Sequence, residues 1–384
     1  MCPKSRTHIF EKIANDADLP EAMRTSAKAR LEAEKEAIKV IKANAGLEGK
    51  LAPSTGNGEF KFRIYSMGNW MPDKTVKYEG KDEPYPGEPH PPPGILVQDS
   101  AGFVVRDEDG NVMQDVAREK CVTGLRATYD LYKQLGRKSL DDNGGEIVAS
   151  IHLPSIDIGA YWWVDQMFFG DGGVTGRGEL MPGVAPSDDL TTWLCAYDLD
   201  TIGHELTHGV ISKTADLTQK EIQADTLNES IADCFGMLVK MWAMKLKVED
   251  SDWDISPGWW AESTVKAKGW TKNYCRTFRK AADHEGDPES KKMSEWKVPI
   301  NDDPHTNCGI PNHAFYTAAC EFGGYAWEHV GRYWYAALTD AEFKRPEKQN
   351  FKGFAELTCR HAGAISGPDA EAIVRKAWAT VEVL

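Results

Sequence analysis

The stretch TIGHELTHGVI, residues 201–211, decides how the rest of the chain is interpreted. It lies in an apolar-periodic segment typical of a helix, and His204 and His208 are four positions apart. Residues with this spacing lie about 40° apart around a helix axis, so both imidazoles can converge on one tetrahedral metal. Glu205 is badly placed as a ligand but near enough to take a proton from water at such a site. The alternative is a pair of ordinary surface histidines, so a third ligand is needed to decide.

A second segment, LNESIAD at residues 227–233, supplies a candidate third ligand. Glu229 follows His208 by 229 − 208 = 21 positions, enough for a loop and the start of another helix. Glu229 and Asp233 again share one helix face. We expect Glu229 to bind the metal and Asp233 to accept the distal N–H of a zinc histidine; the alternative is a solvated acidic face. Two histidines and one glutamate leave a coordination position open, as catalytic zinc sites do.

The composition is typical of a large globular protein. The chain has 384 residues, 41% hydrophobic and 27% charged, and a net charge of −14, which argues against binding nucleic acid or anionic membranes through bulk charge. The sequence contains no run of about 18 apolar residues, so we expect no membrane-spanning helix. The first residues lack the apolar core of a secretory signal, so we expect synthesis in the cytoplasm, with release by a leaderless route as one possibility. Eight scattered cysteines without a C-x-x-C pair favour reduced thiols over a disulfide framework.

Sequence patterns divide the chain into three parts. Residues 1–55 read as helices followed by a linker rich in glycine and proline. Residues 56–200 contain most of the alternating, strand-like segments, and residues 201–384 read mainly as helix. The elements expected in the middle part are strands at 61–65, 147–153 and 162–169 and a helix at 122–135.

Four separated blocks resemble the thermolysin family of gluzincin zinc metallopeptidases, from about residue 62 onward. They are GAYWWVDQMFFGDG at 159–172, the HELTH helix, the helix with Asn228 and Glu229, and PHTNCGIPNHAFY at 304–316. The resemblance implies an α+β fold with a β-rich N-terminal lobe, a mainly helical C-terminal lobe and a zinc cleft between them. The helical N-terminal piece resembles the short propeptide of protealysin-like members.

The resemblance also implies roles for individual residues. Glu205 would be the general base, and His305 would hydrogen-bond the oxyanion of the transition state. Arg276 would grip a substrate carbonyl, although a plain surface arginine is the alternative, and Ala160 would offer its backbone carbonyl to a peptide adding to an edge strand at 162–169. The implied activity is that of a zinc endopeptidase, made as a zymogen and inhibited by its own N-terminal segment, with a preference for an apolar residue after the scissile bond. The alternative for that segment is a permanent helical accessory domain.

Several positions depart from the family pattern. Gly159 stands where the family has a substrate-anchoring asparagine, and Gln219 corresponds to an active-site tyrosine. Ile300 occupies the position of the aspartate that orients the transition-state histidine, so Asp302 and Asp303 are the candidate substitutes. These departures support an alternative function, a catalytically weak zinc-binding protein that recognises peptides.

A further departure concerns calcium. In the family, Asp200 would face a glutamate and both would bind calcium, but that position is Lys240 here. A fixed positive charge cannot ligate calcium, so we expect Lys240 to pair with Asp200 or Asp252 and the double calcium site to be absent. The alternative is that Lys240 extends to solvent.

Overall fold

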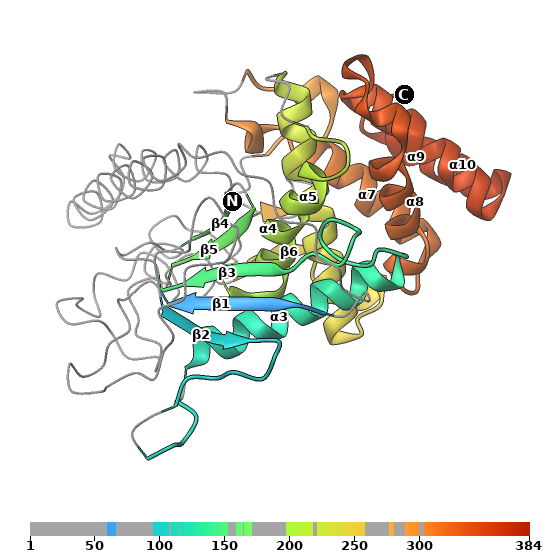
Figure 1. Cartoon of the computed structure of the whole chain (residues 1–384). Coiled ribbons are helices and arrows are strands. Elements are labelled where there is room, and N and C mark those ends of the chain that lie inside the picture. The colour runs from blue at the N-terminus through green and yellow to red at the C-terminus, as the bar shows by residue number, and fades with distance from the viewer. Residues whose placement is uncertain are drawn as a thin grey trace, which may run out of the picture. The chain divides into compact units, whose positions relative to one another are not determined.

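The computed structural model describes most of the chain after residue 59, and the expected helices of the N-terminal part lie outside the described residues. The described residues before Leu199 belong to one compact unit and those from Leu199 onward to a second. Each unit is described by itself below (Figure 1). The described ranges are 60–66, 95–106, 109–113, 115–152, 159–163, 165–170, 197–217, 221–257, 276–279, 289–298 and 303–384.

The first unit contains a five-stranded sheet in the order β2-β1-β3-β5-β4. The two inner pairings, β1 with β3 and β3 with β5, are parallel, and the outer pairings are antiparallel. β3 lies in the middle and all five of its residues are buried, which explains why four of the five are apolar. The strands are β1 Phe62–Ser66, β2 Ile95–Asp99, β3 Ile147–Ile151, β4 Ala160–Trp163 and β5 Gln166–Phe169.

The single strand expected at 162–169 is wrong. Trp163 pairs with Gln166 and Ala160 pairs with Phe169, so this stretch is an antiparallel hairpin of two four-residue strands. The chain reverses between Trp163 and Gln166, and the aromatic residues on both sides of this short reversal resemble a single strand. Within the described sheet, β4 is therefore one of the two edge strands, and β2 is the other.

One long helix, α3 (Val116–Gln134), accompanies this sheet. It begins ahead of the expected Val122 because the side chain of Asp115 caps it, accepting from the backbone N–H of Arg118 at 3.0 Å. The same carboxylate contacts the buried ring of His152 at 3.1 Å, just after β3 ends. This pair ties the start of the helix to the end of the central strand.

The second unit is mainly helical, as predicted. A two-stranded ribbon, β6 with β7, accompanies the helices. No helix in the described part of the chain is both long enough and apolar enough to cross a membrane. The principal elements are α4 Leu199–Ser212, α5 Ile222–Met244, β6 Asp254–Ile255, β7 Arg276–Thr277, α7 Gly309–Phe322, α8 Val330–Thr339, α9 Phe351–Ser366 and α10 Pro368–Thr380.

Two glycines let α4 and α5 pack with their backbones nearly touching. A Cβ atom on Gly236 would lie 2.4 Å from the carbonyl oxygen of Asp200, and one on Gly203 would lie 2.9 Å from Val239. No larger side chain fits at either position without separating the helices. Because Gly203 directly precedes His204 in the chain, this contact sets the distance between the histidines of α4 and the carboxylates of α5.

Candidate active site

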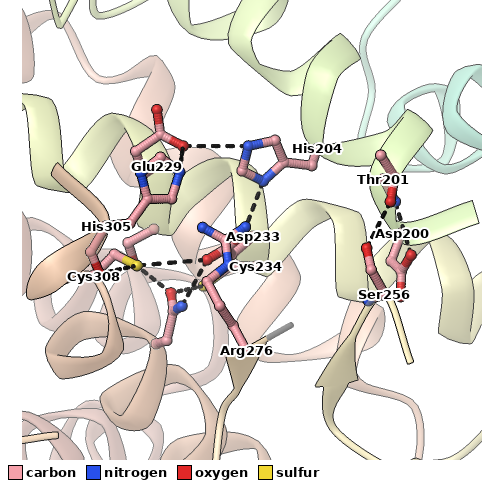
Figure 2. A network of polar contacts seen from close by, with 12 residues as sticks. Asp200, Thr201, His204, Glu229, Asp233, Cys234, Ser256, Arg276, His305 and Cys308 are labelled. Carbon is pink, nitrogen blue, oxygen red and sulfur yellow. Dashed lines mark hydrogen bonds and ion pairs between the residues drawn. The ribbon is translucent and has the colours of Figure 1, made fainter. Parts of the chain in front are cut away.

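Two neighbouring helices bring His204, His208 and Glu229 together; we call these three residues the His–Glu cluster. Figure 2 shows the contact between His204 and Glu229. The Nε2 atoms of the two histidines are 3.0 Å apart, and Glu229 Oε2 lies 3.3 Å from one and 3.6 Å from the other. All three side chains are buried. Their donor atoms lie within 4.8 Å of one another, a group able to hold a metal ion.

The outer nitrogens of both imidazoles are occupied by acceptors. His204 Nδ1 lies 2.8 Å from a carboxylate oxygen of Asp233, and His208 Nδ1 lies 2.9 Å from the side-chain oxygen of Asn228. Each Nδ1 therefore carries the proton, and each Nε2 turns its lone pair towards the other and towards Glu229. Facing lone pairs repel unless a cation lies between them, so this donor set fits zinc.

Protonation in the cluster also favours a metal. Burial lowers the pKa of His208 to about 3, although the Glu229 charge opposes that shift. Burial alone would raise the pKa of Glu229, but His305 and His208 outweigh it and hold that pKa well below the usual range. A neutral imidazole and an ionised carboxylate are the forms that bind a metal.

His305 lies beside this cluster on a short 3-10 helix, η6 (Pro304–Thr306). Its Nε2 is 2.8 Å from Glu229 Oε2, and its Nδ1 is 3.1 Å from Asp303. Burial would lower the pKa of His305, but these two carboxylates raise it to about 9. Asp303 also caps η6 and accepts from the His305 backbone N–H. Of the two candidate substitutes for the family aspartate, Asp303 contacts His305, whereas Asp302 lies outside the described residues.

Arg276 is not a surface arginine. It lies on β7, is 7% exposed, and places Nη2 2.5 Å from Asp233 Oδ1. Burial would raise the pKa of the Asp233 carboxyl, but Arg276 outweighs it and the pKa falls to about 2. Asp233 thus stays ionised between His204 and Arg276, and it links the cluster to β7 (Figure 2).

Sequence reasoning missed several residues around Asp233. Asn312 on α7 donates to Asp233 Oδ2 at 2.9 Å, and its own side-chain oxygen accepts from Ser230 at 2.7 Å. The thiol of Cys308 lies 3.3 Å from Glu289, a buried acid for which the sequence offers no signal. Asn312 and Cys308 do lie inside the motif at 304–316, so their place in that motif could have identified them.

Of the other residues singled out in the sequence, three lie in the described part of the chain and two do not. Glu205 is fully buried on α4, and Ala160 is fully buried on β4 in the first unit. Gly159 is described, and its carbonyl accepts from Gly170 at 2.9 Å. Gln219 and Ile300 lie outside the described residues.

Farther along α5, Lys240 lies among three aspartates. We call Lys240 and these partners, Asp200, Asp252 and Asp254, the lysine site. Its Nζ is 2.9 and 3.0 Å from the two carboxylate oxygens of Asp252, 3.0 Å from the carbonyl oxygen of Asp254 and 3.5 Å from Asp200. Both pairings predicted for Lys240 are present. The alternative of a side chain in solvent is wrong, since Lys240 is 8% exposed.

Known proteins resemble the chain over most of its length. Residues 65–212 match the family described as thermolysin metallopeptidase, catalytic domain, and residues 215–383 match its alpha-helical domain. Protease PrtS of Photorhabdus sp. (strain Az29) is 37% identical over 293 residues, covering 73% of this chain and 72% of that protein. An extracellular metalloprotease of Pectobacterium carotovorum subsp. carotovorum is 32% identical over 292 residues, covering 74% and 78%. The solved structure of the precursor of protealysin, a metalloproteinase from Serratia proteamaculans, matches with a TM-score of 0.71 and 27% identity over 98% of each chain.

Proposed function

Because the chain belongs to the thermolysin family of metallopeptidases, we propose that it is a zinc-dependent endopeptidase that cleaves on the amino side of an apolar residue. The predicted family and its α+β fold are confirmed, and the chain is a metalloprotease. The observation that carries the zinc proposal is the convergence of two imidazole lone pairs and a carboxylate in the His–Glu cluster.

Zinc bound by His204, His208 and Glu229 would supply Lewis-acid polarisation of the substrate carbonyl and lower the pKa of water. Asp233 and Asn228 hold the two imidazoles in the tautomer that such binding needs. These contacts keep the ligand geometry set before substrate arrives.

The remaining residues act on the substrate. Glu205 takes a proton from the attacking water and delivers it to the leaving amine nitrogen. His305, oriented by Asp303, donates an N–H to the oxyanion that develops on the carbonyl oxygen. Arg276 binds a second substrate carbonyl, and the backbone carbonyl of Ala160 accepts from the peptide.

The N-terminal segment, residues 1–49, is proposed to act as an inhibitory propeptide. The match to the protealysin precursor supports this, because it extends over 98% of the present chain. A protease made in latent form is safe at synthesis in the cytoplasm. Removal of the segment would then start activity.

Calcium is proposed to be unnecessary at the lysine site. The ammonium group of Lys240 pairs with both Asp200 and Asp252 and contacts the Asp254 carbonyl, the kind of oxygen that a calcium ion binds. A tethered cation cannot be lost by dilution or chelation.

One experiment tests the proposed activity. The purified full chain, loaded with zinc, is followed by intact mass beside Glu205→Gln. Loss of an N-terminal piece of about 50 residues from the unmutated chain, and not from the variant, is the expected result, because only the former has its general base. A zinc-loaded chain that neither processes itself nor cleaves added peptides would instead favour the catalytically weak peptide-recognition protein, which the Gly159 departure supports.

A further inference from the structure

We propose that Glu289, balanced by Lys291, is a positioning residue that holds Arg276 in the orientation needed to bind substrate. The inference rests on the proposed function, in which Arg276 binds a substrate carbonyl. It concerns residues behind the His–Glu cluster that no sequence motif singles out.

The four charges behind the cluster form an alternating chain. Arg276 reaches Asp233 with Nη2 at 2.5 Å and Glu289 Oε1 with Nε at 3.7 Å. Lys291 Nζ lies 3.2 Å from Glu289 Oε2, on the far side of that carboxylate. All four side chains are buried. Two cations and two anions therefore balance in a region of low dielectric, where removing one charge strands another.

This arrangement holds Arg276 from two directions. The guanidinium is planar, so an anion near Nη2 and another near Nε fix both the plane and the direction of the group. Asp233 alone would leave it free to rotate about that single contact. Glu289 is thus the second anchor, and we infer that it directs Arg276 rather than only adding stability.

Lys291 ties Glu289 to the strand that carries the arginine. Its ammonium donates to the carbonyl oxygen of Thr277 at 2.6 Å, and Thr277 directly follows Arg276 on β7. The Cys308 thiol donates to the same Oε1 of Glu289 that faces Arg276, at 3.3 Å. The carboxylate is therefore held from several sides and can serve as a fixed reference for Arg276.

A glycine permits this arrangement. A Cβ atom on Gly309, the first residue of α7, would lie 2.6 Å from the carbonyl oxygen of Ser290 and 2.8 Å from Lys291 Nζ. It would also lie 2.9 Å from the Cβ atom of Glu289. The segment with both charged residues can approach the helix only because position 309 has no side chain.

A second metal is not needed to explain another group of potential ligands, which consists of Asp233, Glu289 and Cys308. By ligand type, these three residues could hold an ion. Arg276 pairs with both of these carboxylates and already provides the positive charge that an ion would bring. The chemistry of this region is therefore that of a built-in counterion.

The test compares Glu289→Gln, Lys291→Met and the double variant in the zinc-loaded chain after its N-terminal segment has been removed. Glu289→Gln should raise KM for a peptide substrate about tenfold, change kcat less than about threefold, and leave zinc content unchanged. The double variant restores charge balance, so it should recover melting temperature but keep the raised KM. Glu356→Gln is the matched control, since it removes a carboxylate from a partly exposed pair with Lys348 and should leave KM unchanged.

Peptide binding gives a readout that does not depend on turnover. In a Glu205→Gln chain whose N-terminal segment has been removed by an added protease, Glu289→Gln should weaken peptide affinity about tenfold by calorimetry. Recovery of both KM and affinity in the charge-balanced double variant would overturn the inference, because it would show a role in stability alone. An unmutated chain that binds peptide but cleaves none would contradict the proposed function and leave the Glu289 inference to be decided by the binding result.

Discussion

Helix α5 contributes to two acidic sites whose carboxylates face different kinds of partner. At one end, Glu229 faces two imidazole nitrogens whose lone pairs point at one another, and the donor set calls for a metal. Farther along, Lys240 supplies a cation to Asp200 and Asp252 from the chain itself. The proposed difference is one of ligand chemistry: neutral nitrogens and one open position suit a Lewis acid, whereas the oxygen groups around Lys240 already face a cation.

The largest expected effect lies at the metal-binding end of this comparison. Glu205→Gln should lower kcat by about 10²- to 10⁴-fold because a general base is lost, while zinc stays bound. Peptide hydrolysis and metal content, measured together, check this. A Glu205→Gln variant that retains normal turnover would contradict the assignment of the base.

At the lysine site the expected effect is on stability. Lys240→Met should lower the free energy of unfolding by about 3–5 kcal/mol, because Asp200 is left buried without its cation. Denaturant unfolding measures the loss. Lys240→Glu sharpens the contrast: its melting temperature should rise with added calcium, whereas that of the unmutated chain should not. A calcium-dependent melting temperature in the unmutated chain would refute the replacement.

A smaller effect is expected from the residue that orients His204. Asp233→Asn keeps the shape of the side chain but weakens the contact with Nδ1, so zinc affinity should fall about 10- to 100-fold. Competition with a chelator measures this affinity. The same assay on Lys240→Met should show unchanged zinc binding, because we expect the two sites on α5 to act independently.

The smallest effect is a pH dependence that should be absent near neutrality. Burial would lower the pKa of Lys240, but Asp200 and Asp252 outweigh it and raise the pKa above 10.5. A cation whose pKa is higher in the folded state stabilises fully below its unfolded value and loses that contribution as the pH rises through the folded value. The difference in melting temperature between the unmutated chain and Lys240→Met should therefore stay constant from about pH 6 to 9 and shrink only in strong alkali. A difference that vanished at neutral pH would mean that Lys240 is not the cation of this site.

The two ends of α5 also show what could be read from the sequence. His204 with His208, and Glu229 with Asp233, are four apart on helices, so helical geometry places them correctly before any tertiary contact is known. For the residue that orients His305, the sequence left both Asp302 and Asp303 as candidates, because a loop has no helical periodicity that could choose between them. Glu289 and Lys291 could not be found, since their position depends on a close approach to Gly309 and on a ribbon distant in sequence.

The fold shows the same boundary between local and non-local information. The helical character of the second unit follows from apolar periodicity. The hairpin of β4 and β5 was missed because aromatic residues lie on both sides of a very short reversal, and the early start of α3 depends on the Asp115 cap. In each case the deciding contact is a single residue or pairing that a pattern averaged over a window does not resolve.

The most direct test of the central claim is the metal content of the purified full chain after exposure to both zinc and calcium and removal of free ions. We predict a single zinc per chain and no calcium, because the facing imidazole nitrogens of the His–Glu cluster need a cation between them, whereas Lys240 already supplies one at the lysine site. Stoichiometric calcium, or the absence of zinc, would contradict this prediction.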